Sequence, residues 1–266
     1  APVRAEDHQL LIELMEGVED IPGAALQEGL SWDWESFEDY MDHLAGREFD
    51  MDLGAQLPHA AMRVYVMGQR GADREPATPE DVRQMQEITS RAIRAGALGF
   101  STSRTLNHRT IRGEPTPTLK AEAEELLGIS KAIKEVGRGV MEMISDFDDL
   151  DLEFELLKSM VRESGRPMSI SVAQGISPHG WRKMLKRIEG ANNDGLLMRG
   201  QVAPRAIGIL LGLTTTLSPF SARPAFTEIS KLPIEERLVA LRDPGRKALI
   251  LKEKPGRGFE RLFNMM

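Results

Sequence analysis

Hydrophobic residues recur along the chain with two different spacings. In the stretch 79–95 the apolar positions Val82, Met85 and Ile88 follow one another at intervals of three, which predicts an amphipathic helix. Short runs such as 139–145 are apolar over only a few residues, which is typical of strands. From about residue 62 to residue 202 the two patterns alternate, and this alternation predicts an α/β protein with a parallel sheet.

Five strands are predicted, and helices of roughly ten to fifteen residues separate them, the length of right-handed βαβ crossovers. Five such strands are enough for a complete doubly wound sheet. They also match the middle strands of an eight-stranded barrel. The periodicity does not decide between these two architectures. The predicted strands are 62–68, 96–104, 139–145, 167–174 and 196–202.

We expect one domain over 1–266, with a helical insertion region at 1–60 and a loop followed by helices at 206–266. The alternating strands and helices fill 61–205 between them. The first residues read as the exit of a strand that is not present, and the last residues stop within an amphipathic pattern without a cap. We therefore expect the chain to be a segment of a longer protein.

Polar side chains stand at the C-terminal ends of the predicted strands and in the loops after them, where α/β enzymes place their chemistry. Arginine forks match carboxylates, so Arg104 or Arg205 is expected to hold an anionic substrate. Ser103 and His108 are expected to line the pocket, and Glu142 is a possible ligand or proton relay. The full set of predicted site residues is Ser101, Ser103, Arg104, His108, Glu142, Gln174 and Arg205.

Two tryptophans precede a predicted helix that carries Phe37 and Tyr40. Trp32 and Trp34 either pack this helix onto the body of the protein or form an aromatic rim over a pocket, and the sequence leaves both alternatives open.

Composition narrows the classes of function. The net charge of −7 argues against nonspecific nucleic-acid binding, which requires a basic surface. The chain has no cysteine, which excludes disulfides and a cysteine nucleophile within it and fits a cytoplasmic protein. No apolar run is long enough to span a bilayer, so we expect no membrane partner.

Motif searches exclude several kinds of site. Among the five histidines there is no His-x-His and no His-Glu-x-x-His pair, and His59 is expected to cap or pack rather than to bind metal. There is no glycine-rich phosphate loop. Ser101 and Ser103 lack a Gly-x-Ser-x-Gly elbow, which argues against a serine triad.

Several stretches together resemble the N-acyl-D-amino-acid deacylases (D-aminoacylases) of the amidohydrolase superfamily. Trp32-Asp-Trp-Glu-Ser-Phe37 with Tyr40 looks like the family's Trp-x-Trp-x-Ser-Phe-x-x-Tyr helix start. Pro58-His59 followed by Met62-Arg-Val-Tyr-Val-Met-Gly68 resembles its Gly-His…Leu-Arg…Val-Met-Gly stretch. Ala77-Thr78, Met85 and Gly96-Ala-Leu-Gly-Phe-Ser101-Thr102 are similar to its Ala-Thr…Met…Gly-Ala-x-Gly-x-Ser-Thr signature.

The resemblance implies a zinc-dependent hydrolase on a (β/α)₈ TIM barrel, of which this chain would be the central part without the first and last strands. The family's His-x-His pair, its cysteine ligand and its catalytic aspartate would then lie outside the chain. Two internal strands depart from the family. The predicted strand 140–145 carries no histidine, and Val172 and Gln174 stand where the family has a ligand histidine and a substrate-binding lysine.

We therefore expect a segment of a metal-dependent amidohydrolase that cleaves a linear amide C–N bond, as in an N-acyl amino acid. The isolated segment is expected to be inactive, and its open strand edges favour an oligomer. The alternative is a catalytically altered pseudoenzyme or small-molecule binding protein on the same barrel.

Overall fold

The computed structural model describes residues 1–19, 21–173, 179–204, 211–215 and 218–254. The chain divides into two compact units, the first made of Ala1–Val172 and Leu185–Gln201 and the second of Ala173–Met184 and Val202–Met266. No described helix combines the length and the apolar character that crossing a bilayer requires.

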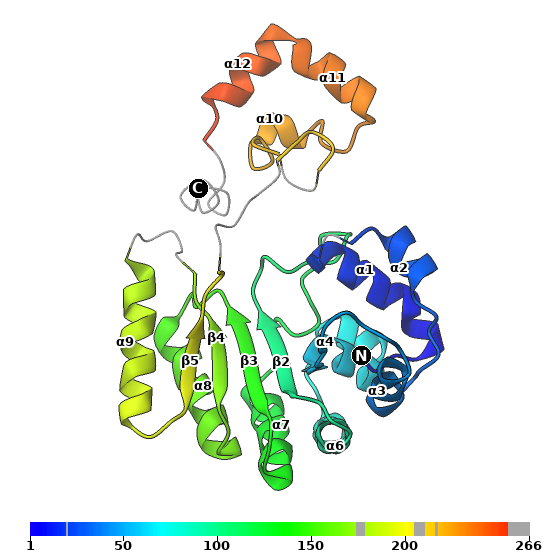
Figure 1. The fold of residues 1–266 in the computed structure, drawn as a ribbon. Helices are drawn as coiled ribbons and strands as arrows, with labels where there is room; N and C mark the ends of the chain where they lie inside the picture. The colour runs from blue at the N-terminus through cyan, green and yellow to red at the C-terminus, as the bar shows by residue number, and fades with distance from the viewer. Residues whose placement is uncertain (20, 174–178, 205–210, 216–217, 255–266) are drawn as a thin grey trace. The chain divides into compact units, whose positions relative to one another are not determined.

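The first unit is built on a parallel sheet of five strands, and the strands lie side by side in the order in which they occur along the chain (Figure 1). A doubly wound sheet reverses its strand order at a switch point. This sheet has no reversal, so it is not doubly wound, while the predicted α/β class with a parallel sheet is confirmed. The strands are β1 (Leu57–Pro58), β2 (Gly99–Arg104), β3 (Val140–Ser145), β4 (Met168–Ser171) and β5 (Met198–Gln201).

Helices connect the successive strands. After β1 come α4 (His59–Met67), α5 (Gln69–Ala72) and α6 (Pro79–Arg94), and the later crossovers contain α7 (Ala123–Val136), α8 (Leu150–Ser164) and α9 (Gly180–Asn193). Helix α6 starts as its sequence predicts, because Thr78 and Asp81 form a reciprocal capping box around Pro79.

The prediction of a strand at 62–68 is wrong, because these residues belong to helix α4. Alternating Val64 and Val66 suggested a strand, but the fully buried positions His59, Met62 and Arg63 recur with helical spacing. Gly68 ends the helix with a φ of 57°, and its N–H donates to the carbonyl of Val64. The strand that pairs with β2 on the side opposite β3 is the short β1, immediately before α4.

The register divides the sheet into an apolar and a polar face. One row runs across all five strands through Leu57, Phe100, Met141, Met168 and Met198, none more than 1% exposed. This row faces the helices, since the Ser130 hydroxyl of α7 lies 3.8 Å from the sulfur of Met141.

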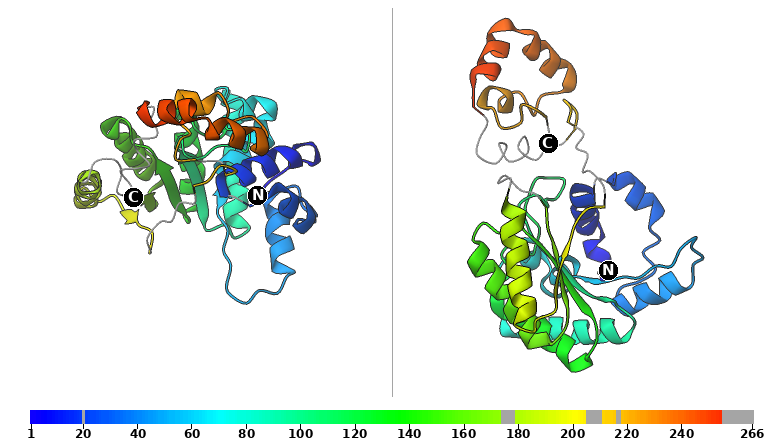
Figure 2. Two further views of the ribbon diagram at one scale, coloured as in Figure 1. Left: turned by 90° about the horizontal axis from the view of Figure 1, so that it is seen from above. Right: turned by 60° about the vertical axis from the view of Figure 1, so that its left-hand side comes forward.

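The next row points to the opposite face, because side chains alternate along each strand. It consists of Pro58, Ser101, Glu142, Ser169 and Arg199, and none of these five residues is buried. The polar face of the sheet therefore lies away from α7. Figure 2 shows the sheet between α7 and α8 on one side and the N-terminal helices on the other.

The N-terminal part contributes short helices that flank the polar face. They are the 3₁₀ turn η1 (Ala5–Asp7), α1 (His8–Glu19), α2 (Gly23–Gly29) and α3 (Phe37–Ala45). Helix α3 begins at a capping box between Ser36 and Asp39.

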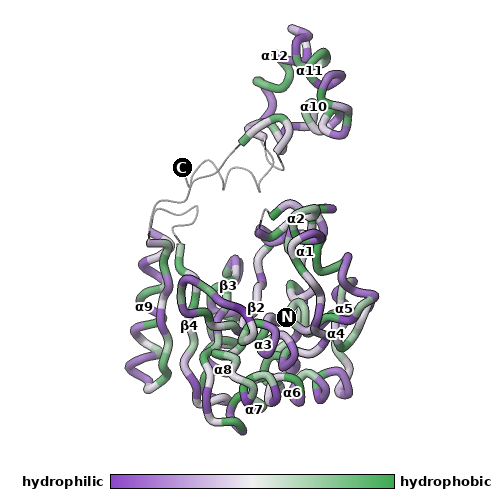
Figure 3. Tube along the Cα trace, turned by 45° about the vertical axis from the view of Figure 1, so that its right-hand side comes forward, coloured by the Kyte–Doolittle hydropathy of each residue, from purple (hydrophilic) through white to green (hydrophobic). Residues whose placement is uncertain are grey.

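The second unit contains α10 (Pro224–Thr227), α11 (Ile234–Arg242) and α12 (Pro244–Lys252) around a small core. That core is formed by Ala225, Phe226, Ile229 and Ile250. Asp243 caps α12, as its position before Pro244 predicts. Figure 3 shows hydrophobic and hydrophilic residues mixed along these three helices, which is typical of a small unit with a thin core.

Candidate functional site

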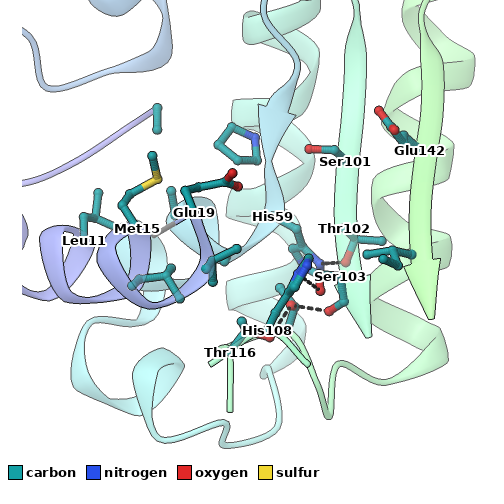
Figure 4. Close-up of a pocket in the computed structure, with 18 of the residues that line it drawn as sticks. Leu11, Met15, Glu19, His59, Ser101, Thr102, Ser103, His108, Thr116 and Glu142 are labelled. Carbon is teal, nitrogen blue, oxygen red and sulfur yellow. Dashed lines mark hydrogen bonds between the residues drawn. The ribbon is translucent and has the colours of Figure 1, made fainter. Parts of the chain in front are cut away.

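A cavity of about 560 Å³ lies against the polar face of the sheet. Helix α1 forms one side, and strands β2 and β3 with the loop 105–118 form the other (Figure 4). The two sides differ in chemistry. The strand side and the loop supply hydroxyl, imidazole and carboxylate groups, whereas α1 supplies mostly hydrocarbon. The cavity is of a size that holds small organic ligands in proteins.

The apolar side follows from the sequence of α1. Leu11, Leu14, Met15 and Val18 recur at intervals of three and four and therefore share one face of the helix. Leu11 and Leu14 are buried, whereas Met15 is 41% exposed although it lines the cavity. A large apolar side chain that remains open to a cavity can contact a ligand without first breaking a packed core.

The aromatic residues combine the two roles that the sequence leaves open. Trp34 is buried, its indole N–H donates to the carbonyl of Ala1 at 2.9 Å, and its ring packs against Tyr40 at 5.2 Å. Trp32 stacks on His8 with ring centroids 4.2 Å apart. Trp32, Trp34 and Tyr40 also line the cavity. The aromatic cluster thus packs the N-terminal helices and extends the apolar side of the site.

On the strand side, Ser103 and His108 form a hydrogen-bonded pair. The Ser103 hydroxyl oxygen lies 2.7 Å from Nδ1 of His108 (Figure 4). The Thr118 hydroxyl donates to the Ser103 carbonyl at 2.5 Å, which holds the loop against the end of β2. Burial lowers the pKa of His108 below its ordinary 6.5, although Glu19 and Asp146 act in the opposite direction. The imidazole is therefore neutral at pH 7.

Two carboxylates line the same cavity, Glu19 from α1 and Glu142 from β3. Glu142 lies beside Ser101 in the register and accepts a hydrogen bond of 3.0 Å from the side-chain amide of Gln56. In Figure 4, Ser101 and Glu142 lie above Ser103 on neighbouring strands. The predicted residues Ser101, Ser103, His108 and Glu142 are therefore brought to one cavity.

Arg104 has a different environment. Its guanidinium forms two hydrogen bonds with the Glu153 carboxylate, of 2.6 and 3.3 Å, and a third with the carbonyl of Ala121. It is not among the described residues that line the cavity. The other predicted residues, Gln174 and Arg205, lie outside the described residues.

Sequence reasoning missed a buried polar network beside the cavity. His59 contacts the Thr102 hydroxyl through Nδ1 at 2.8 Å and the Glu125 carboxylate through Nε2 at 2.6 Å. Glu125 also forms an ion pair with Arg63, and all three charged or ionisable side chains are about 1% exposed. Glu125 stands four residues before Ile129 and eight before Ile133, which are buried on the same face of α7. This helical spacing is the signal in the sequence that distinguishes it from the exposed Glu124.

The network sets the protonation of its members. Burial lowers the pKa of His59, opposed by Glu125, so the ring is neutral. Burial alone would raise the pKa of Glu125, but the hydrogen bonds and charges of His59 and Arg63 hold it below its ordinary 4.5. The expectation that His59 caps or packs fits this position at the start of α4.

The described residues do not fit a zinc centre. Nowhere among them do three histidine, aspartate or glutamate side chains gather so that they could hold one metal ion. Both nitrogens of His59 already have partners, and Nδ1 of His108 is bonded to Ser103. Three or four such ligands are the usual requirement for zinc.

Comparison with known proteins identifies relatives. No protein-family model matches the chain. A D-aminoacylase from Alcaligenes xylosoxydans xylosoxydans is 26% identical over 112 residues, which are 42% of this chain and 21% of that protein. The chain thus spans about a fifth of the curated relative that it matches.

Solved D-aminoacylase structures share the fold. A D-aminoacylase mutant in complex with CuCl₂ superposes with a TM-score of 0.55 at 24% identity, covering 70% of this chain and 38% of the other. A structure concerned with the binuclear metal centre of D-aminoacylase gives 0.57 at 22% identity, over 88% and 48%. A third, described as defining a novel subset of amidohydrolases, gives 0.56 at 21% identity. The predicted resemblance is confirmed: the chain is similar to D-aminoacylases over part of their length.

Proposed function

We propose that the first unit is a wall of a (β/α)₈ barrel and supplies the substrate-binding side of an enzyme that hydrolyses a linear amide, such as an N-acyl amino acid. Three observations support this. The strands follow one another without reversal, as barrel strands do. The fold is that of D-aminoacylases. The cavity lies against β2 and β3, where a polar row meets an apolar helix.

The observation that carries the proposal is that the Ser103–His108 pair and the apolar face of α1 lie on opposite sides of one cavity. An N-acyl compound has a polar amide next to a hydrocarbon group, and the cavity offers a complementary surface to each. The Ser103 hydroxyl can donate to the amide carbonyl once its hydrogen bond with His108 is exchanged. Neutral His108 can then accept a hydrogen bond from the ligand or from water.

Hydrolysis itself requires an activated water, which a bound metal ion supplies in metal-dependent hydrolases. Zinc would be that metal by resemblance, but the described residues do not fit a metal centre. Of the two carboxylates that line the cavity, Glu19 and Glu142, we propose Glu142 as the proton relay, because it lies beside Ser101 on the strand side. We expect the chain by itself to bind the amide and not to turn it over.

The test is a direct assay of the complete 266-residue chain. Binding of the D and L enantiomers of N-acetyl and longer N-acyl amino acids is measured by calorimetry. Release of the free amino acid is measured with and without added Zn²⁺. The proposal expects saturable binding that Ser103→Ala weakens several-fold. Absence of binding by every N-acyl compound overturns it.

A second function, binding of the small molecule without hydrolysis, is favoured by one observation. Val172, at the end of β4, cannot bind metal, and no described cluster replaces the missing ligands. Metal analysis separates the two functions when it is made on the longer protein to which such a barrel wall would belong, since both functions expect the chain by itself to bind the amide without turnover. One tightly held zinc per protein, with amide hydrolysis that chelation abolishes, supports the enzyme. A folded and metal-free protein that binds the amide supports the binding function.

A further inference from the structure

The cavity has an extended hydrocarbon side, and the extent of this side bears on the length of the acyl group that the site accepts. We infer that the site accepts an acyl chain of several carbons, longer than acetyl, and that this chain lies along α1 toward the tryptophans. The inference deepens the proposed function and rests on it. It concerns which N-acyl compounds are preferred, not whether the bond is cleaved.

The first argument is geometric. Figure 4 places Leu11 and Met15 on one side of the cavity and the Ser103–His108 pair on the other. A carbonyl held at Ser103 therefore has its substituent directed either along the strands, past Ser101 and Glu142, or toward α1. The second direction is mostly hydrocarbon, because Met15 and Val18 line it and Trp32 extends it, and Glu19 is the charged residue that α1 adds to the lining.

The second argument concerns size. An acetyl group is a single methyl beyond the carbonyl, which leaves most of a cavity of about 560 Å³ unfilled. Each additional methylene that leaves water for this surface strengthens binding by about fourfold, since its burial contributes roughly 0.8 kcal/mol. The gain continues until the chain passes beyond the tryptophans. The exposed side chain of Met15 is unbranched and flexible, so it can adapt to chains of different length.

The experiment is a series in which only the acyl group changes. N-acetyl-, N-butanoyl-, N-hexanoyl- and N-octanoylglycine are titrated into the full chain, and binding is followed by calorimetry and by tryptophan fluorescence. Octanoic acid serves as a probe without the amide. We expect affinity to rise about fourfold per methylene and the fluorescence to change with the longer chains.

Variants locate the effect. Met15→Gln with Val18→Thr keeps the volume and the helix but adds polar atoms, and we expect about tenfold weaker binding of octanoylglycine and little change for acetylglycine. Met51→Gln is the matched control, since Met51 is 72% exposed and does not line the cavity. Urea unfolding of each variant checks that the fold is retained.

The outcomes distinguish the two proposals. Equal affinity along the series overturns the acyl-chain inference and leaves amide binding standing. If octanoic acid binds as tightly as octanoylglycine and the variants weaken both, the acyl-chain surface is supported while the amide proposal fails. If the double variant and Met51→Gln weaken octanoylglycine equally, the chain does not lie along α1 and the inference is overturned.

Discussion

Nε2 of His59 lies 2.6 Å from a carboxylate oxygen of Glu125, across 66 positions of the sequence. The contact joins the first residue of α4 to α7, and Thr102 of β2 joins the same ring from its other nitrogen. Because Arg63 shares the carboxylate, a single glutamate compensates one buried cation and holds one neutral histidine. The edge of the cavity therefore depends on a polar core and not on apolar packing alone.

Replacing Glu125 should destabilise the protein strongly. Glu125→Ala leaves Arg63 buried without its counter-ion, and we expect the free energy of unfolding to fall by about 3–5 kcal/mol. Urea denaturation measures it. Glu124→Ala, one residue earlier and exposed, is the control and should change stability by less than about 0.5 kcal/mol. Equal effects of the two variants would contradict the buried network.

His108 should make the stability pH-dependent. Its pKa is lowered in the folded state, so the unfolded chain binds a proton first as the pH falls below 6.5. The stability that neutral His108 contributes is fully present above pH 6.5 and is lost as the pH falls through the lowered pKa of His108 in the folded state. NMR titration should place the His108 midpoint below 6.5, and His108→Asn should make the loss of stability between pH 7.5 and 5.5 smaller. A midpoint above 6.5 refutes this prediction.

Arg104 should act on stability and not on ligand binding. Arg104→Ala removes the paired hydrogen bonds to Glu153, and we expect about 1–3 kcal/mol of lost stability. Affinity for N-acyl amino acids should stay unchanged, because Arg104 does not line the cavity. A variant that binds an N-acyl amino acid poorly, yet binds the corresponding neutral amide normally, would show instead that Arg104 meets the substrate carboxylate.

Glu142 should oppose anionic ligands. Glu142→Gln removes a negative charge from the cavity while keeping a group that can bond to Gln56. Affinity for an N-acyl amino acid should rise on the order of tenfold at low salt, because a like charge nearby is lost. The uncharged N-acyl amino acid amide is the control and should bind the variant and the original chain equally. Tighter binding of both ligands would indicate a packing effect.

Gly99 should be irreplaceable where β2 meets β3. A Cβ on Gly99 would lie 1.8 Å from the carbonyl oxygen of Val140, so the two strands would have to separate. Gly99→Ala should therefore lower the free energy of unfolding by about 3 kcal/mol. Gly190→Ala meets no atom within 4 Å and should stabilise α9 by about 0.4–1 kcal/mol. Comparable midpoints for the two variants would contradict the close approach.

Local sequence signals predicted the helices whose ends are marked by capping residues or glycines in the adjacent sequence. Helix α6 begins at Thr78 because its cap and its N-terminal proline are adjacent in the chain, and α7 ends before Gly137, which has a left-handed backbone. The residues 62–68 resemble a strand in sequence because the β-branched Val64 and Val66 are two positions apart, as on one face of a strand. What makes them a helix is the burial of His59 and Arg63 against Glu125, a residue far along the chain.

The sequence by itself determined the α/β alternation, the caps, the hydroxyl residues of β2 and the resemblance to D-aminoacylases, because each depends on neighbouring residues or on a motif. Only the tertiary structure decided which side chains share the cavity. Ser101 and Ser103 point away from α7 because the apolar row through Phe100 packs on the helices. Arg104 pairs with Glu153, and α1 closes the cavity. These relationships depend on contacts between distant segments, which no local pattern contains.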